Sequence, residues 1–327
     1  MQCRSDDDGG ASSLLALANM KSFAVVFVLG CLFMSNAAGS SGFEFEFDVR
    51  SHLGTKTSYA SYLLHRDGHS CSAREAELHA YATDNACSPR NAYFIFRHGT
   101  RFPTAKKMAK LQNTERSFAV VFGEEEASRL LRIPTPFRAM DAGLLTPKGV
   151  DEMVQLGKRT RQRFKSLFEN REYHPMTYDI YSTEVLRTSQ SAHAFAEGFF
   201  NGKVPSNFAV VSKSSDHDRV LRFHKSCPKY LARVKRNKTV NGPDSESAKY
   251  WDAVGNEIAE KVSAALSALR EEAADKDALA VDADTALRLW SSCVYQASSL
   301  DDPDGMCRIF DDADVSKMEF MDDIDAY

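Results

Sequence analysis

The 327-residue chain lacks an excess of basic charge, a paired-cysteine pattern and any apolar run long enough to span a bilayer. Its formal net charge of −4 argues against general nucleic-acid binding, which needs a basic surface. The seven cysteines include no CxxC spacing, so the usual cysteine pairing of a zinc site is missing. A hydrophobic content of 43% is enough for a sizeable core, which excludes global disorder.

A short apolar run near the start of the chain has the pattern of a secretory signal peptide. Residues 21–34 place one lysine before the apolar run, and the small residues Ala37 and Ala38 follow at a spacing that suits signal peptidase. Met20 stands where the natural first residue would be, so we interpret residues 1–38 as an upstream extension plus leader. The alternative is a membrane anchor, which needs a longer apolar run. We expect the mature protein to be secreted or lumenal, without a stable membrane span.

The cysteines after the leader and one glycosylation sequon bear on the expected secretion. If the chain is secreted, its thiols meet an oxidising environment, and an odd number leaves at least one without a partner in the chain. The sequon Asn237-Lys238-Thr239 predicts an N-linked glycan at Asn237, the alternative being an unmodified surface loop. The five cysteines after the leader are Cys71, Cys87, Cys227, Cys293 and Cys307.

Apolar patterning predicts strands that turn directly into helices. Residues 92–96 (AYFIF) form a short apolar, aromatic run typical of a buried strand, and residues 177–182 indicate a second strand. Strand-to-helix units with a long helical part indicate an α/β core, residues 39–205, carrying a mainly α-helical cap, residues 206–327. Helices are expected from Pro103 and Thr104 through Leu111, and over residues 146–168, 183–200, 217–236 and 246–274.

The turn after the first predicted strand places His98 between two arginines. A neutral imidazole can attack phosphorus and form a phosphohistidine, which divides a hard hydrolysis into two easier steps. The guanidinium groups of Arg97 and Arg101 suit bidentate binding of phosphate oxygens, and their charge disfavours the imidazolium form of His98. Gly99 lets the backbone come close to a substrate. A lone histidine between arginines is usually a surface residue, but the whole string RHGTRFPT is much more specific.

RHGTRFPT, Arg97 to Thr104, resembles the signature of the histidine acid phosphatases, in the branch of the multiple inositol polyphosphate phosphatases. The resemblance extends from about residue 43 to the end of the chain. It implies an α/β fold in which a sheet flanked by helices carries an α-helical cap. Four further segments are similar to the same family: HLGTKTSY at 52–59, STEVLRTSQSA at 182–192, DRVLRFHKSC at 218–227 and the ending at 307–327.

The resemblance implies roles for individual residues. His98 is the implied nucleophile, and Arg97, Arg101 and Arg187 are the implied phosphate ligands. The implied reaction is dephosphorylation of inositol polyphosphates, phytate included, with no metal or cofactor; the partner is a small polyphosphorylated molecule, which the basic segment 97–116 would steer. Thr104 and Lys107 lie near enough in sequence to contact substrate, the alternative being an ordinary surface helix. The spacing of Cys293 and Cys307 resembles that of a disulfide pair in the family.

One family feature is missing from the sequence. The family completes its site with a late His-Ala-Glu segment whose acid protonates the leaving alkoxide, and no such segment occurs here. Since this sequence also lacks the last core strands of the family, we expect this chain to turn over phytate very poorly or not at all. The alternatives are a non-catalytic phosphate-binding or unstable product, and, less in keeping with the leader and the Arg187 segment, a transferase similar to phosphoglycerate mutase.

Overall fold

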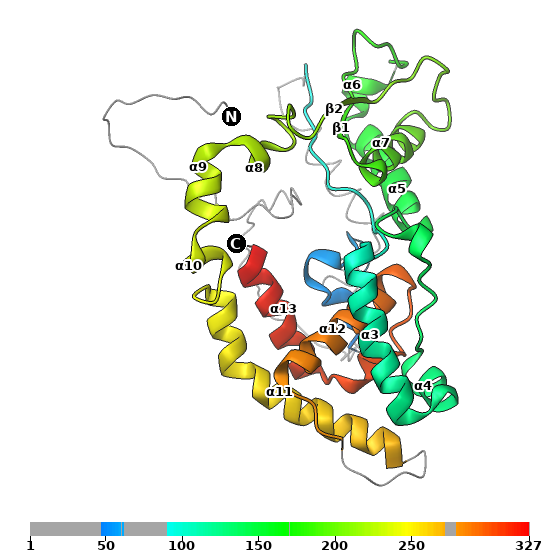
Figure 1. Cartoon of the computed structure of the whole chain (residues 1–327). Coiled ribbons are helices and arrows are strands. Elements are labelled where there is room, and N and C mark those ends of the chain that lie inside the picture. Colours follow the sequence, from blue (N-terminus) through cyan, green and yellow to red (C-terminus); the bar gives the residue numbers. More distant parts are fainter. Residues whose placement is uncertain (1–46, 60, 62–89, 170, 272–278, 327) are drawn as a thin grey trace, which may run out of the picture.

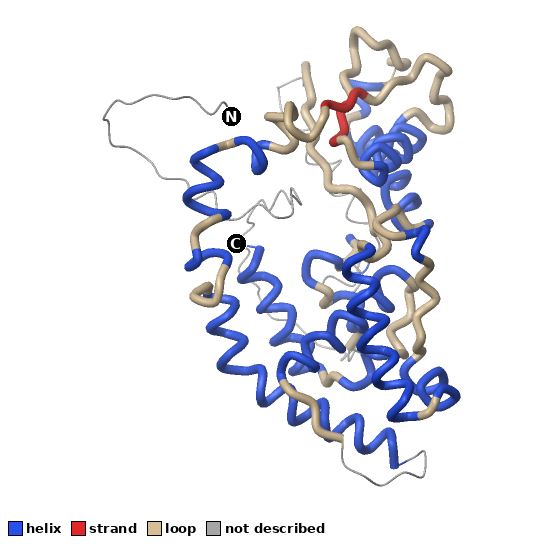
Figure 2. Tube along the Cα trace, in the orientation of Figure 1, coloured by secondary structure: helices blue, strands red, loops and turns tan. Residues whose placement is uncertain are grey.

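The computed structural model describes residues 47–59, 61, 90–169, 171–271 and 279–326. The predicted leader, Cys71 and Cys87 lie outside these residues. Helices dominate, and the strands of the described part form one short parallel pair (Figure 2). None of the helices described is both long and apolar enough to cross a membrane.

A large helical group forms the lower part of the molecule (Figure 1). Its hydrophobic core is built mainly from residues of these helices, with Leu131, Ile258, Leu289 and Met318 each at most 2% exposed. The core thus joins residues from both of the ranges that the sequence analysis divided into core and cap. The group comprises α3 (Ala105–Phe122), α4 (Glu124–Leu131), α11 (Glu246–Glu271), α12 (Ala283–Ser299) and α13 (Asp312–Ala326).

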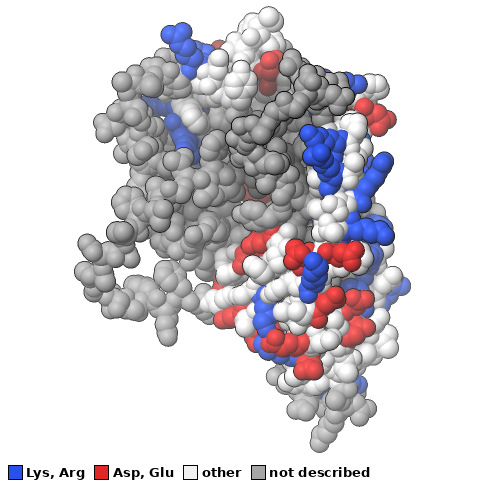
Figure 3. Space-filling model, turned by 90° about the vertical axis from the view of Figure 1, so that its left-hand side faces the viewer, with Lys and Arg blue, Asp and Glu red and all other residues white. Residues whose placement is uncertain are grey.

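Two features fasten this group together. Cys293 on α12 and Cys307 in the 3-10 helix η5 (Met306–Ile309) are joined by a disulfide inside the core. Lys261 on α11 bonds to Asp311 and Asp314 at 3.3 and 3.2 Å, so part of the acidic C-terminal segment is paired with α11. Side chains of both signs are interspersed on the face shown in Figure 3.

The N-terminal part of the described chain packs on α13. This part contains two short 3-10 helices, η1 (Val49–Ser51) and η2 (Gly54–Lys56). Between them, the Nδ1 atom of His52 lies 2.7 Å from the Oε2 atom of Glu319 on α13. A Cβ on Gly54 would lie 2.9 Å from the Asp322 side chain. Segments far apart in the sequence are therefore neighbours beneath the RHGTR turn.

The upper part of the molecule contains α5 (Pro147–Arg163), α6 (Lys165–Phe168), α7 (Leu186–Phe199) and the strands β1 (Tyr181–Thr183) and β2 (Val211–Lys213) (Figure 1). The strands pair in parallel, with Ser182 opposite Ser212. Helices α5 and α7 approach closely, because a Cβ at Gly157 would overlap the Phe195 carbonyl and one at Gly198 would overlap that of Val154. These glycines set the distance between the two helices that flank the RHGTR turn.

Local sequence rules predicted the helix starts well. Thr104 caps α3 by accepting a hydrogen bond from the Lys107 amide, and Thr146 caps α5 with Pro147 as its first residue. The helix predicted over residues 146–168 is interrupted, because Phe164 leaves the helical conformation and the short α6 follows. The last helix predicted, over residues 246–274, is confirmed as α11 over Glu246–Glu271, and residues 272–274 lie outside the described residues.

Other predictions need correction. Residues 92–96 form no strand and are not buried: Tyr93 is 91% and Ile95 54% exposed. A strand needs a partner for its backbone groups, and no backbone hydrogen bond joins this run to another described residue. The second strand, predicted over residues 177–182, is confirmed only at Tyr181 and Ser182. The observed strand continues to Thr183, and α7 begins at Leu186 instead of Thr183. The helix predicted over residues 217–236 is instead three short elements: α8 (Phe223–Ser226), α9 (Pro228–Tyr230) and the π-helical turn η4 (Leu231–Lys235). The next helix, α10 (Lys238–Asn241), begins after this range.

Candidate active site

The RHGTR turn is fixed by backbone pairing with the start of α5. The amide of Phe102 donates to the Leu144 carbonyl at 2.9 Å, and the amide of Thr146 donates to the Thr100 carbonyl at 2.9 Å. Contact is so close that a Cβ at Gly149 would overlap the backbone of Thr100. The RHGTR segment therefore lies directly against the start of helix α5, which is possible because Gly149 has no side chain.

His98 is held as a neutral imidazole with one nitrogen available. Its Nδ1 atom lies 2.8 Å from the carbonyl oxygen of Gly99. A carbonyl oxygen only accepts hydrogen bonds, so Nδ1 carries the proton and Nε2 keeps its lone pair. Burial lowers the pKa of His98 to about 4, and the charges of Arg97, Arg187 and Arg101 add to that effect. Nε2 thus keeps a lone pair that could attack an electrophile even in mildly acidic solution.

The three arginines singled out from the sequence are brought together around His98. Burial lowers the pKa of Arg187, and the charges of Arg101, Arg97 and Arg222 lower it further. Arginine stays protonated even so, so the cluster holds several positive charges in one place. The Nε atom of Arg187 is buried and has no hydrogen-bond partner among the described residues. A buried charged donor without an acceptor indicates a site for an anion.

The loop arginines are oriented by backbone carbonyls. Arg97 donates from Nη1 to the Thr55 carbonyl at 2.6 Å, and Arg101 donates from Nη1 to the Phe102 carbonyl at 2.8 Å. Ser299, at the end of α12, donates to the carbonyl of Arg101 at 3.2 Å. Each guanidinium keeps further N–H groups for a ligand.

Two cations that the sequence analysis did not assign also belong to this cluster. Lys56 is half-buried in η2, with Nζ 5.8 Å from the centroid of the Tyr295 ring. Burial lowers the pKa of Lys56 and the neighbouring Arg97 and Arg101 lower it further, against the opposing effect of Asp322. Arg222 has a buried Nε without a described partner. Both residues lie in segments that resemble the family, but spacing alone could not show that Lys56 lies near Arg97 and Arg101 or that Arg222 lies near Arg187.

Thr104 and Lys107 have different surroundings. The hydroxyl of Thr104 caps α3, so its position is explained by the helix. Lys107 donates to the Ser291 hydroxyl at 2.9 Å, and burial lowers its pKa, followed by the charges of Lys56 and Lys110. Lys107 and Lys110 line a groove of about 620 Å³ between α3 and α12, together with Arg288 and Asp284.

One carboxylate is hydrogen-bonded to the RHGTR turn. Glu152 on α5 accepts from both the amide and the hydroxyl of Thr100, at 2.8 and 2.9 Å. Sequence reasoning missed this residue, because the two partners are 52 positions apart.

The described residues contain no group of three or more His, Cys, Asp or Glu side chains that could hold a metal ion. The arrangement suits nucleophilic attack by Nε2 on an anion held by arginines.

Comparison with known proteins agrees with this chemistry. The family described as "Histidine phosphatase superfamily (branch 2)" matches residues 90–327. Multiple inositol polyphosphate phosphatase 1 from Homo sapiens is 24% identical over 303 residues, which cover 84% of this chain and 57% of the relative. The protein of the same name from Gallus gallus is 26% identical over 254 residues, covering 74% of this chain and 51% of the relative. The chain thus spans little more than half the length of these curated relatives.

A solved structure and a further relative extend the comparison. The crystal structure of the phytase from D. castellii superposes with a TM-score of 0.51 at 18% sequence identity, covering 71% of this chain and 49% of that one. Testicular acid phosphatase from Mus musculus is 29% identical over 168 residues, or 49% of this chain and 33% of the relative. The fold is therefore histidine-phosphatase-like, with many helices and a small described sheet.

Proposed function

Because the chain belongs to branch 2 of the histidine phosphatase superfamily, we propose that it is a phosphomonoesterase acting on inositol polyphosphates through a phosphohistidine. The observation that carries the proposal is a neutral His98, whose Nδ1 proton faces the Gly99 carbonyl, surrounded by Arg97, Arg101 and Arg187. An imidazole kept unprotonated among fixed cations suits attack on a phosphate anion.

In the proposed reaction the arginines bind the oxygens of one phosphate group. Nε2 of His98 forms a bond to phosphorus while the bond to the ester oxygen breaks, and the ester oxygen leaves with the electron pair and takes up a proton. Water then attacks the phosphohistidine, the N–P bond breaks, and the electron pair returns to Nε2 as inorganic phosphate leaves. The arginines counter the charge on the transferred group in both steps.

The substrate class is argued from charge and from the relatives. Two relatives are named multiple inositol polyphosphate phosphatase, and the solved neighbour is a phytase. Lys56 lies beside the loop arginines, and Lys107 lies beside Lys56. One bound phosphate leaves much of this positive charge uncompensated, so a substrate with several phosphate groups suits the site better than a monophosphate.

Leaving-group protonation is the step for which no residue is assigned. The sequence contains no His-Ala-Glu segment, so we expect the chain to favour esters whose leaving group needs little protonation. Para-nitrophenyl phosphate should be hydrolysed faster than phytate. Binding of phytate without release of phosphate from either ester would instead favour the second candidate, a non-catalytic phosphate-binding protein.

The proposal also covers the cellular location of the protein and its division into domains. We place the protein in the secretory pathway, with cleavage near residue 38, an α/β core at 39–205 and an α-helical cap at 206–327. Asn237 would carry a glycan; its Oδ1 accepts from the Thr239 amide and hydroxyl at 3.1 and 2.8 Å. Expression in secretory cells, with and without peptide N-glycosidase treatment, tests this: Asn237→Gln should remove the shift in mass.

The central test is acid-quench trapping. Full chain is mixed with phosphate-labelled substrate, quenched and mapped for labelled peptides. Label on residues 97–101 that disappears in His98→Ala supports the proposal, whereas equal labelling of the variant contradicts it.

A further inference from the structure

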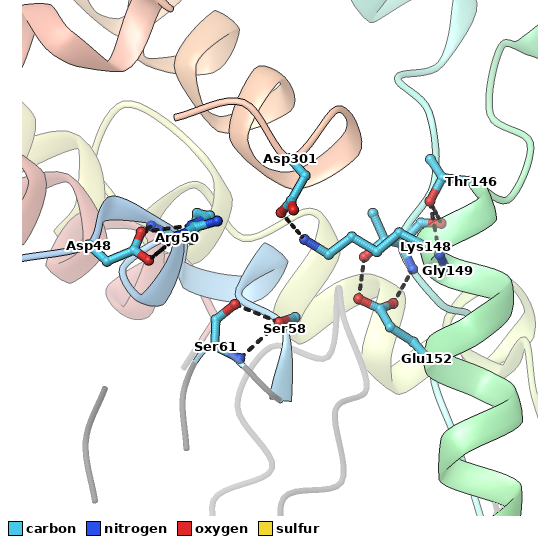
Figure 4. A network of polar contacts seen from close by, with 10 residues as sticks. Asp48, Arg50, Ser58, Ser61, Thr146, Lys148, Gly149, Glu152 and Asp301 are labelled. Carbon is cyan, nitrogen blue, oxygen red and sulfur yellow. Dashed lines mark hydrogen bonds and ion pairs between the residues drawn. The ribbon is translucent and has the colours of Figure 1, made fainter. Parts of the chain in front are cut away.

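Glu152 on α5 holds the RHGTR turn by two hydrogen bonds to Thr100. Figure 4 shows its carboxylate beside the start of α5, near Thr146 and Gly149. The Oε2 atom accepts from the amide of Thr100 at 2.8 Å, and Oε1 accepts from its hydroxyl at 2.9 Å. Thr100 stands between the nucleophile His98 and the ligand Arg101, so this contact acts on the centre of the turn.

The carbonyl of Thr100 is held from the same helix. It accepts from the Thr146 amide at 2.9 Å and from the Thr146 hydroxyl at 3.0 Å. The same hydroxyl accepts from the Gly149 amide at 3.0 Å. All polar atoms of Thr100 are therefore bound within the first two turns of α5, and bonds to a carboxylate are the stronger kind.

Through α5, this contact fixes the turn relative to Arg187. Helix α5 packs directly on α7, whose second residue is Arg187, with the backbones in contact at Gly157 and Gly198. The Ser191 hydroxyl of α7 in turn accepts from the amide of Gly99 at 3.2 Å. The nucleophile and the ligands on two different elements thus share one rigid support.

We propose that Glu152 is a positioning residue, which sets the geometry of His98 and Arg101 against Arg187 by holding Thr100. Each of its oxygens accepts a hydrogen bond from Thr100, so its effect on the site passes through the turn. Phosphoryl transfer to an imidazole requires alignment of Nε2 with the breaking bond, and a displacement of about 1 Å can cost about 10²-fold in rate. The catalytic part of this inference rests on the proposed function.

Two variants of Glu152 and one control distinguish the effect of its hydrogen bonds to Thr100 from the effect of its negative charge. Glu152→Ala removes both bonds to Thr100 and should lower kcat by about 10²-fold. Glu152→Gln keeps an acceptor for the amide and gains a donor for the hydroxyl, so it should recover to within about tenfold of wild type. Asp151→Asn is the matched control, since Asp151 is exposed on the same helix and bonds only to Gln155 among the described residues; it should leave kcat unchanged.

The readouts are kcat and KM for para-nitrophenyl phosphate, thermal unfolding, and amide hydrogen exchange of the peptide containing residues 97–101. Glu152→Ala should speed exchange in this peptide while the helices α11 to α13 stay protected. Wild-type exchange and kcat in Glu152→Ala would overturn the proposal, as would equal impairment of the Ala and Gln variants. If wild type releases no phosphate at all, the proposed function fails, and the exchange experiment alone still decides whether Glu152 holds the turn.

Discussion

The Nδ1 atom of His98 lies 2.8 Å from the carbonyl oxygen of Gly99, the next residue in the chain. This short bond selects the tautomer in which Nε2 is unprotonated and turned away from its own backbone. The bond to Gly99 also raises the pKa of His98, but burial and the surrounding arginines outweigh it and lower the pKa to about 4. This value predicts how the proposed activity responds to acid.

We predict that kcat/KM for para-nitrophenyl phosphate stays high on the acid side until about pH 4. An ordinary imidazole would lose its lone pair at about pH 6.5. Above pH 4 the folded protein holds His98 neutral, and below it the nucleophile is protonated and the rate falls. A pH–rate profile in buffers of constant ionic strength measures this, and an acid limb already complete at pH 6.5 would contradict it.

His98→Ala should abolish phosphohistidine formation and lower kcat to background, with little change in thermal stability. The side chain sits in a half-buried turn and belongs to none of the hydrophobic clusters, so its loss leaves the core intact. Circular dichroism and unfolding curves serve as the control. A variant that unfolds at the wild-type temperature but keeps its label would place the nucleophile elsewhere.

Arg187→Gln should weaken phosphate binding and rate together and also move the acid limb to higher pH. The charge of Arg187 is one of the causes that lower the pKa of His98, so its removal lets the imidazole protonate more readily. Inhibition by inorganic phosphate measures the loss of binding. Arg171→Gln, at an exposed position away from the cluster, provides the control; an unchanged acid limb in Arg187→Gln would show that its charge does not reach His98.

Reduction of the Cys293–Cys307 disulfide should destabilise the helical group by about 3 kcal/mol, because a loop of about 15 residues gains that much closure entropy when opened. Both cysteines are buried in the core, so their thiols should resist alkylation in the native protein. Mass mapping of the non-reduced protein measures the bond, and denaturant unfolding of Cys293→Ala/Cys307→Ala measures its effect. Two alkylated thiols in the unfolded, non-reduced chain would contradict the disulfide.

The sequence could predict local features well and long-range ones poorly. Thr104 and Thr146 were predicted to begin helices because a capping hydroxyl acts on amides two or three residues ahead. The strand over residues 92–96 was wrong because an apolar run indicates a tendency to be buried but does not supply a pairing partner. Instead, Phe94 and Phe96 pack against Phe164 and Phe195 on the helical side.

The same difference between local and long-range features explains which residues of the site could be predicted from the sequence. The string RHGTR, with the family resemblance that it carries, predicted a role for three residues within five positions, and the similar segment at 182–192 predicted one for Arg187; the structure brings these four residues together. Lys56 and Glu152 reach the loop through the packing of η2 and α5, and Arg222 reaches Arg187 through the packing of the 218–227 segment. Their separations from His98 follow no periodic rule, so no pattern in the sequence could have connected them.

The bond between His52 and Glu319 determines when, during synthesis of the chain, the support for Arg97 can form. Arg97 is oriented by the carbonyl of Thr55, and the turns η1 and η2 that present this carbonyl rest on α13. During synthesis the RHGTR turn leaves the ribosome more than two hundred residues before α13 does. The nascent chain therefore carries its nucleophile for most of its translation without the support that orients Arg97, and tight phosphate binding should arise only after residues 319–322 have emerged and docked.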